Sequence, residues 1–444
     1  MSSTTPTTET SRAELKKRRR TLFASSVGTF IEYFDYASYS YLALTLAQVF
    51  FADSDPGVAV VQTFGLFALS FVMRPLGALF WGHVGDRIGR KRTLAFTIIG
   101  MGIATTAIGL LPGYAVLGLI APLLLLLLRM TQSFCASGEY AGAAVLVGES
   151  APIRQRARWI SAVPIGSATG FLLASFTSTG LHAALPEDAM LEWGWRVPFL
   201  LSAPLTLIAW YIRTRMEESP VFRAMEKAVE DKAVVAPVNP LRSLFRDHWR
   251  TVIRMLLIMA INACGYYLVL TYMATYLEQE VGLSGLDSNV IVTVALVVYL
   301  PLLYLFATMA DRYGRKRILM ISSILFVLVT LPAFLVLGST GFVGALIVQL
   351  LLVAIFAMND GVFATLFVES FPTSVRFSGF ALPFNVGNAL FGGLAPLTAA
   401  WLIEVTGAPT APAFIVIALA VVAIIALLRT PETKPTADAD RVDA

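Results

Sequence analysis

The sequence is poor in charged residues, in cysteine and in histidine. Only 14% of its 444 residues are Asp, Glu, Lys or Arg, against about 25% in an average soluble domain. The two cysteines, Cys135 and Cys264, lie in separate apolar stretches, so we expect small core residues and no disulfide. The three histidines are isolated and lack the spacing of metal ligands. These shortages argue against a disulfide scaffold and against a metal site.

The chain also lacks the motifs of nucleotide-driven machines. No Gly-x-x-x-x-Gly-Lys-Ser/Thr run occurs, which argues against an ATP-driven pump with a P-loop. Gly100-Met-Gly102 lies inside an apolar stretch and is therefore not a phosphate-binding loop. We predict that the protein is not an enzyme and needs no cofactor. A membrane sensor or receptor is the alternative outside transport, but no polar segment is long enough for an output domain.

Long apolar runs are what the sequence has in abundance. Hydrophobic residues make up 57% of the chain, and the mean hydropathy is +0.73. An apolar run of about 20 residues can cross a bilayer as a helix. The pattern predicts an all-α membrane protein with twelve spans, near residues 21–51, 58–84, 93–111, 115–148, 159–182, 196–215, 251–280, 287–310, 318–338, 341–370, 379–405 and 409–429.

Basic and acidic residues alternate from loop to loop. Lys16–Arg20, Arg87–Arg92 and Arg312–Arg317 belong to one set of loops, whereas residues 52–57 and 183–194 carry acids without Lys or Arg. Basic loops stay in the cytoplasm, so we expect both termini there and the chain in the inner or plasma membrane. This orientation also accounts for the net charge of +4, and we predict no nucleic-acid partner.

Two motifs occur once in each half of the chain. They are Gly82-x-x-x-Asp86-Arg87-x-Gly89-Arg90 with Asp311-Arg312-x-Gly314-Arg315, and Glu149-Ser-x-Pro with Glu369-Ser-x-Pro, each of the latter followed by an arginine, Arg156 or Arg376. Internal repeats of this kind are typical of transporters built from two related halves. We therefore predict an N-terminal tail at 1–20, a six-helix bundle at 21–215, a cytoplasmic central loop at 216–250, a second six-helix bundle at 251–429 and a C-terminal tail at 430–444.

These motifs resemble those of the major facilitator superfamily. The Asp86 loop resembles its loop signature, and Arg129-Met-Thr-Gln132 its Arg-x-x-Gln motif. The finer pattern is similar to the metabolite:proton symporter family, and it includes Ile31–Tyr36, Arg74–Gly77, Gly138-Glu139-Tyr140, Glu192–Phe199, Leu270–Met273 and Phe384-Asn385. The resemblance implies the twelve-helix fold, with two bundles related by a pseudo-two-fold axis, and alternating access. It implies a proton as coupling ion and a small metabolite as substrate, and the family includes permeases for proline and betaine, citrate, 2-oxoglutarate and shikimate.

Ionisable residues inside spans are costly and mark candidate sites for substrate or proton. Glu32 and Asp35 share one face of the first span, and desolvation of a carboxylic acid favours the neutral form that proton coupling requires. Arg129 is deep in the fourth span, and a guanidinium must pair with an anion there. The complete candidate set for substrate and proton coupling is Glu32, Asp35, Arg129, Glu139, Asp360, Asn385 and Asn388. Each could instead brace neighbouring helices.

Aromatic residues favour a particular substrate class. Tyr33, Tyr36, Tyr39, Tyr266 and Tyr267 crowd the first and seventh spans, where their faces could hold an ammonium group by cation–π attraction or simply pack as core. Since buried acids are at least as many as buried cations, we expect a zwitterion or monocarboxylate, such as proline or betaine. Symport of 2-oxoglutarate, citrate or shikimate-like acids is the alternative. We expect membrane lipid and the substrate as partners, and a functional monomer.

The repeated loops are interpreted as a cytoplasmic gate. We expect Asp86 to lie at the positive end of the third helix, and basic residues of the loops to pair with acids such as Glu149 across the cytoplasmic face. The predicted gate comprises Gly82, Asp86, Arg87, Gly89, Arg90, Glu149, Asp311, Arg312, Gly314, Arg315, Glu369 and Arg376. Arg74 is a buried cation with a structural or gating role.

Overall fold

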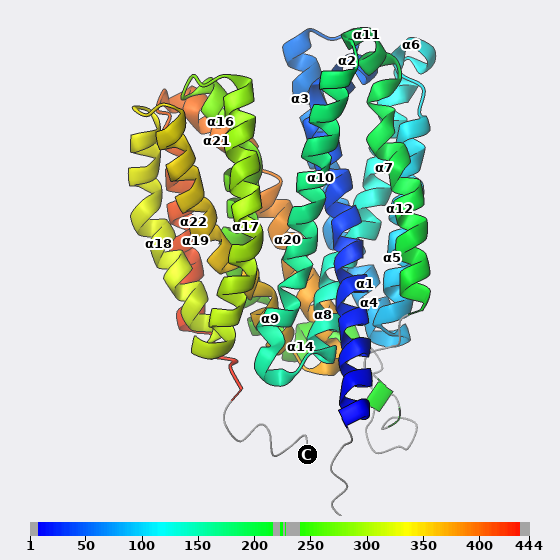
Figure 1. The fold of residues 1–444 in the computed structure, drawn as a ribbon, viewed down its shortest axis with the longest axis vertical. Helices are drawn as coiled ribbons and strands as arrows, with labels where there is room; N and C mark the ends of the chain where they lie inside the picture. The colour runs from blue at the N-terminus through cyan, green and yellow to red at the C-terminus, as the bar shows by residue number, and fades with distance from the viewer. Residues whose placement is uncertain (1–7, 216–222, 225–226, 228–239, 436–444) are drawn as a thin grey trace, which may run out of the picture.

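The protein forms two side-by-side bundles of long helices in a computed structural model (Figure 1). The structure describes residues 8–215, 223–224, 227 and 240–435, with the backbone alone for 8–21, 23–25, 44, 56–57, 60–61, 64 and 90. The N-terminal bundle runs from α1 to α12, and the C-terminal bundle from α15 to α22. The fold predicted from sequence is confirmed. Most of the predicted central loop lies outside the described residues, and within it α14 (Pro240–Asp247) is helical.

The helices of the N-terminal bundle follow the predicted spans with local breaks. Their bounds are α1 Thr8–Tyr41, α2 Ala43–Phe50, α3 Pro56–Ser70, α4 Met73–Ile88, α5 Arg90–Leu110, α6 Tyr114–Leu117, α7 Ile120–Ala136, α8 Glu139–Ser150, η1 Ile153–Gln155, α9 Arg156–Ile160, α10 Ala162–Ala184, α11 Glu187–Ala189, η2 Met190–Gly194 and α12 Arg196–Thr214. The backbone of α1 begins at Thr8, inside the segment that we predicted to be a tail.

The C-terminal bundle repeats this arrangement. Its elements are α15 Trp249–Gly265, η3 Tyr266–Tyr272, α16 Met273–Gln279, α17 Gly285–Tyr313, α18 Arg315–Leu337, α19 Phe342–Glu369, η4 Thr373–Val375, α20 Arg376–Gly387, η5 Asn388–Gly392, α21 Ala395–Thr406 and α22 Ala411–Leu428. The segments η3 and η5 are π-helical turns inside two spans. Such turns often mark functional positions in helices.

Along the spans, many large apolar side chains are exposed and several charged side chains are buried. In the described part of the chain, eleven helices are long and apolar enough to cross a membrane. The twelfth, α1, is not among them because it carries Glu32, Asp35 and several hydroxyl groups. Large apolar side chains such as Ile103 and Leu328 are exposed on the outside, whereas Glu32 and Asp35 of α1 are buried. This inverted distribution suits a chain whose solvent is lipid.

Glycine allows α1 to approach α10 closely. A Cβ atom at Gly166 would lie 2.5 Å from the carbonyl oxygen of Ser26, and a Cβ atom at Gly170 would clash with the carbonyl oxygen of Phe30. Small residues are the usual means of close helix packing in membranes. Side chains of α1 are thereby held at the centre of the molecule.

Both repeated loops form the same tight turn at one end of the molecule. Gly89 has φ 95° and Gly314 has φ 112°, a region that favours glycine because it has no Cβ. Each turn reverses the chain between two spans, α4 to α5 and α17 to α18. We call this end, which carries residues 86–92 and 311–317, the basic end, and the opposite one the acidic end. The described chain starts and finishes at the basic end (Figure 1).

Candidate functional site

Glu32 and Asp35 are two buried acids of α1 with different surroundings. Glu32 is buried, and its Oε1 accepts a hydrogen bond from Nη2 of Arg74 at 3.4 Å. Arg74, on α4, also lies against the rings of Tyr36 at 4.7 Å and Phe71 at 4.8 Å. The cation predicted to be structural or gating is therefore paired with one of the predicted coupling acids.

Asp35 and Arg129 form the second charged group near the centre. Arg129, on α7, donates from Nη1 to Gln132 at 2.5 Å, and its guanidinium lies 4.3 Å from the ring centroid of Tyr39. Asp35 faces the guanidinium of Arg129 and the hydroxyl of Thr105, but among the described residues neither of its oxygens makes a hydrogen bond of ordinary geometry, and Nε and Nη2 of Arg129 have no acceptor. Because buried charges without partners are costly, these atoms are candidates for contact with substrate or proton.

Glu139 is paired with an arginine that the sequence analysis missed. Arg213, in the last turn of α12, binds both oxygens of the Glu139 carboxylate, and Nη1 is 2.7 Å from Oε2. Thr97 donates to the same oxygen at 3.2 Å. Arg213 lies at the end of the predicted span 196–215 and was not among the predicted site residues, but its side chain is buried. No sequence signal distinguishes an arginine that turns inward at a span end from one that reaches into water.

Aromatic rings join the bundles at mid-height. The ring of Tyr33 lies 5.6 Å from that of Tyr266 on η3 and 6.3 Å from that of Tyr140 on α8. Tyr140 stacks on Phe384 of α20 at 4.6 Å. The hydroxyl groups of Tyr140 and Tyr266 are buried without a hydrogen-bond partner among the described residues. Of the predicted cavity aromatics, Tyr33, Tyr36, Tyr266 and Tyr267 are brought together and Tyr140 joins them, whereas Tyr39 stacks on Phe67 instead.

Asp360 is held by a polar cluster inside the C-terminal bundle. Its Oδ1 accepts from Nδ2 of Asn262 at 3.0 Å, and its Oδ2 from the hydroxyl of Tyr299 at 2.6 Å. Asn262 also donates to Asn359 at 3.0 Å. Tyr299 was missed by the sequence analysis because one tyrosine in an apolar span carries no pattern. Both oxygens of Asp360 are therefore engaged, unlike those of Asp35.

The two asparagines of the eleventh span do different things. Nδ2 of Asn385 donates across the bundle interface to the carbonyl oxygen of Ser137 at 2.7 Å. Asn388 donates within its own helix to the carbonyl oxygen of Phe384 at 2.9 Å. Asn385 is thus an interface residue, whereas Asn388 makes only a local hydrogen bond here.

At the basic end, each bundle caps a helix of the other. Asp86, on α4, accepts from the backbone N–H groups of Phe377 and Ser378 at 3.2 and 3.0 Å, at the start of α20. Asp311, on α17, accepts from those of Ala157 and Arg158 at 3.0 and 2.9 Å, at the start of α9. The first N–H groups of a helix lack internal partners and attract acids. The sequence did not predict this contact of Asp86 with a helix of the opposite bundle, and the expectation that Asp86 also serves the third helix stays a prediction.

Ion pairs surround these two caps in a similarly reciprocal way. Arg376 donates to Glu149 at 2.9 Å, and Arg156 to Glu369 at 3.5 Å, so each motif glutamate faces the motif arginine of the other half. Arg315 bonds Asp311 and Glu369, both at 3.1 Å, within its own bundle. These pairs close the basic end around the caps.

The remaining predicted gate residues lie around this network. A Cβ atom at Gly82 would lie 2.9 Å from Cα of Ser378, so glycine permits α4 to approach α20. Arg87 and Arg312 are exposed, and the side chain of Arg90 lies outside the described residues. The hydrogen bonds that join the bundles gather toward the basic end, and the ribbons spread apart toward the acidic end (Figure 1).

Secondary transporters have a buried polar centre that is closed toward one side of the membrane by contacts that can break. Such proteins expose a midplane site alternately to each side of the membrane by rocking two bundles. The chain belongs to the Major Facilitator Superfamily, whose family model matches residues 25–382 and 255–443. It is therefore a multi-pass membrane transporter and not an enzyme.

Similar proteins of known name cover most of the chain. It is 35% identical over 424 residues to the proline/betaine transporter of Salmonella typhimurium, covering 94% of this chain and 84% of that protein. It is 36% identical over 420 residues to the glycine betaine/proline/ectoine/pipecolic acid transporter OusA of Dickeya dadantii, covering 94% and 83%. It is also 36% identical to the inner membrane metabolite transport protein YhjE of Escherichia coli, covering 95% and 96%.

A solved structure shares the fold at lower sequence identity. The proton:xylose symporter XylE bound to 6-bromo-6-deoxy-D-glucose matches with a TM-score of 0.78 and 18% identity, covering 95% of this chain and 97% of that one. At this identity the match supports the arrangement of the helices and says nothing about the substrate.

Proposed function

We propose that this protein is a symporter that couples proton entry to uptake of a small zwitterion such as proline or betaine. The observation that carries the proposal is a cluster of aromatic rings, Tyr33, Tyr140 and Tyr266, that continues through Tyr36 to the guanidinium of Arg129: the ring of Tyr36 lies 6.3 Å from that of Tyr33 and 5.3 Å from the guanidinium. The relatives named for proline, betaine, ectoine and pipecolic acid all carry substrates that bear both a cation and a carboxylate.

The geometry supports a zwitterion by offering a partner for each charge. Two nitrogens of the Arg129 guanidinium, Nε and Nη2, have no protein acceptor among the described residues, and a substrate carboxylate is a good acceptor for a planar fork of donors. The ring faces suit an ammonium group, with about 2 kcal/mol from a desolvated cation–π contact. A di- or tricarboxylate would need more unpaired cations, because Arg74 and Arg213 already pair with Glu32 and Glu139.

We further propose that a carboxyl group of α1 carries the coupled proton. Asp35 is the first candidate because it is buried beside Arg129 and Thr105 and, among the described residues, neither of its oxygens makes a hydrogen bond of ordinary geometry. Glu32 is the second candidate, since only one of its oxygens is bonded to Arg74. Substrate and proton binding at adjacent positions on α1 would link the two events.

The orientation follows from the charge pattern. Basic segments stay in the cytoplasm, so the basic end and both termini would face the cytoplasm. The conformation described here would then be closed toward the cytoplasm and would receive substrate from the outside. Release inside would require the Asp86 and Asp311 caps to separate.

The experiment is uptake by purified protein in proteoliposomes. An inwardly directed proton gradient should drive accumulation of labelled proline or glycine betaine above its equilibrium level, and a protonophore should abolish it. Unlabelled pipecolic acid should compete, whereas citrate, 2-oxoglutarate and shikimate should not. Proton-driven accumulation of one of these three acids, with none of proline or betaine, would refute the zwitterion proposal.

A further inference from the structure

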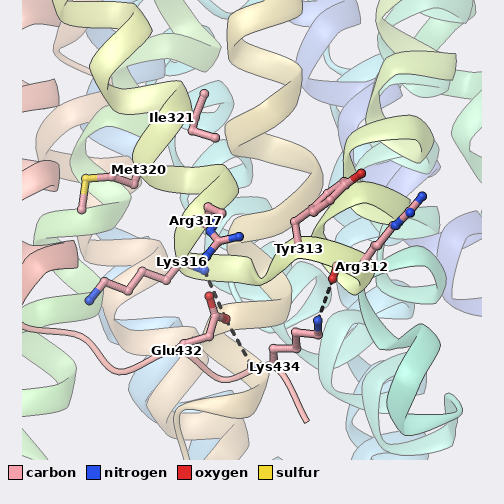
Figure 2. A pocket seen from close by; sticks show the side chains of 8 residues that line it. All are labelled: Arg312, Tyr313, Lys316, Arg317, Met320, Ile321, Glu432 and Lys434. Carbon is pink, nitrogen blue, oxygen red and sulfur yellow. Dashed lines mark hydrogen bonds between the residues drawn. The ribbon is translucent and has the colours of Figure 1, made fainter. Parts of the chain in front are cut away.

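A cavity at the basic end lies away from the polar centre and has a different character. It has a volume of about 590 Å³ and lies between the α17–α18 turn and residues 432–434, which follow the last span (Figure 2). Its lining residues are Arg312, Tyr313, Lys316, Arg317, Met320, Ile321, Glu432 and Lys434. Four of the eight are cations and one is an acid.

The single acid in this cavity is already engaged. Oε1 of Glu432 accepts from the backbone N–H groups of Arg315 at 2.8 Å and Lys316 at 3.4 Å, the first residues of α18. It also accepts from the N–H groups of Thr433 and Lys434 at 3.0 and 3.1 Å. Glu432 thus serves as a cap for α18 and does not form an ion pair with any of the four lining cations.

The four cations keep an excess of positive charge in the cavity. Among the described residues, none of Arg312, Lys316, Arg317 and Lys434 forms an ion pair with a carboxylate. Lys434 donates to the carbonyl oxygen of Arg312 at 2.6 Å, and Lys316 to that of Leu428 at 3.4 Å, neither of which carries a net charge. A cavity that gathers unneutralised cations is suited to an anion.

The apolar part of the lining indicates that the anion is attached to a lipid. Ile321 is 41% exposed on the outer face of α18, one turn deeper than Arg317, and Tyr313 is 43% exposed at the end of α17. Tyrosine is enriched at the membrane–water interface, and basic pockets at the ends of spans bind anionic lipid headgroups. If the phosphate of a lipid headgroup lay among the cations, the acyl chains of that lipid would lie along the exposed apolar side of α18.

We propose that this cavity binds the phosphate headgroup of an anionic phospholipid. The site is independent of the transported substrate and rests only on the membrane location of the chain. A neighbouring cavity of about 480 Å³ shares Arg312 and Lys434 with it and is also lined by Arg154 of the N-terminal bundle and by Asp311 of the gate. A bound headgroup would therefore lie beside the contacts that close the basic end.

The test compares two variants that lose equal charge. One is Lys316→Ala with Arg317→Ala in the cavity, and the control is Arg92→Ala with Arg250→Ala, exposed at the same end but outside it. Each full-length protein is released from nanodiscs of equal parts phosphatidylglycerol and phosphatidylcholine, and retained lipids are counted by native mass spectrometry. A titration with short-chain phosphatidylglycerol then measures affinity, and matching circular dichroism spectra show that both variants fold.

We expect the cavity variant to bind phosphatidylglycerol about thirty-fold more weakly, equivalent to about 2 kcal/mol at 1.4 kcal/mol per tenfold, and the control to change little. An equal loss of phosphatidylglycerol affinity in the cavity variant and in the control variant would overturn the proposal. Binding of inorganic phosphate as tight as that of the lipid would reassign the site to a soluble anion. Lipid binding seen only after removal of residues 436–444, which include three aspartates, would assign the cavity to that acidic segment.

Discussion

At the scale of single residues, the buried charges fall into two kinds. Glu139 and Arg213 satisfy one another through two hydrogen bonds, and Asp360 has a donor on each oxygen. Asp35 and part of Arg129 have no such partners among the described residues. A fully paired charge stabilises one structure, whereas an unpaired one is available to bind something that arrives and leaves.

The first prediction concerns Asp35. Asp35→Asn keeps the size of the side chain but cannot take up a proton, so we expect it to abolish accumulation driven by a pH gradient. Exchange of labelled for unlabelled substrate across the vesicle, which needs no net proton movement, should persist. Both activities are measured in the same proteoliposomes.

The control for this prediction is Glu404→Gln, the same acid-to-amide change at an exposed position of α21. It should leave both accumulation and exchange unchanged. Full proton-driven accumulation by Asp35→Asn and also by Glu32→Gln would show that α1 does not carry the proton.

The second prediction concerns the Glu139–Arg213 pair. Arg213→Met leaves a buried carboxylate without its cation, and we expect a loss of about 3–5 kcal/mol in the free energy of unfolding. Replacing both partners, as Glu139→Leu with Arg213→Met, should recover most of that loss because no charge remains buried. Thermal unfolding in detergent compares the stability of the unaltered protein, the single variant and the double variant. A double variant no more stable than the single one would contradict the assignment of Glu139 and Arg213 as a buried ion pair.

At the scale of elements, the gate is built from helix ends. Asp86 caps α20 and Asp311 caps α9, each from the opposite bundle. A capping side chain stabilises a helix N-terminus by accepting hydrogen bonds from its first N–H groups, even when that side chain belongs to a distant part of the chain. The closed basic end is thus favoured by two interactions that vanish when the bundles separate there.

The third prediction follows from this arrangement. Asp86→Ala with Asp311→Ala removes both caps, each worth about 0.5–2 kcal/mol, so the basic end should open in a larger fraction of molecules. Nitroxide labels on Arg92→Cys in α5 and Arg250→Cys in α15, with both native cysteines replaced by serine, report this by electron–electron double resonance. We expect a longer distance to gain population.

A matched acid at the other end provides the control. Asp53→Ala removes an acid from the acidic end and should leave the label distance across the basic end unchanged. An unaltered distance distribution in the Asp86 and Asp311 double variant would show that the caps do not hold the gate.

At the scale of the whole molecule, the two bundles meet through an interface of uneven strength. The caps and ion pairs lie at the basic end, and mid-height contacts are aromatic, such as Tyr140 on Phe384. The bundles can rock if the polar contacts at the basic end break while the aromatic rings at mid-height stay in contact and shift past one another. The π-helical turns η3 and η5 lie in two spans of the C-terminal bundle at this middle zone.

The fourth prediction is that the two ends move in opposite directions. A second label pair, on Asp188→Cys in α11 and Leu286→Cys in α17, spans the acidic end. Addition of proline or betaine at low pH should shorten the distance across the acidic end and lengthen that across the basic end. Movement of both ends in the same direction would exclude rocking about a central site.

The amino-acid sequence by itself predicted the helical membrane fold, including the eleven helices of the described chain that are apolar enough to cross a membrane, and it named most of the buried charges. Length and apolarity decide whether a segment enters a bilayer, and these properties belong to each segment alone. The repeated Asp86 and Glu149 motifs also indicated a gate, because a motif that occurs twice is visible without coordinates.

Only the tertiary structure decided which partner each of these groups has. The sequence did not show that Asp86 caps α20 of the opposite bundle or that Arg213 is the buried partner of Glu139. Spacing along one helix says which side chains share a face, but contacts between helices depend on how the bundles pack. The physical reason is that a charge buried among helices is stabilised by whatever lies beside it in space, at any distance along the chain.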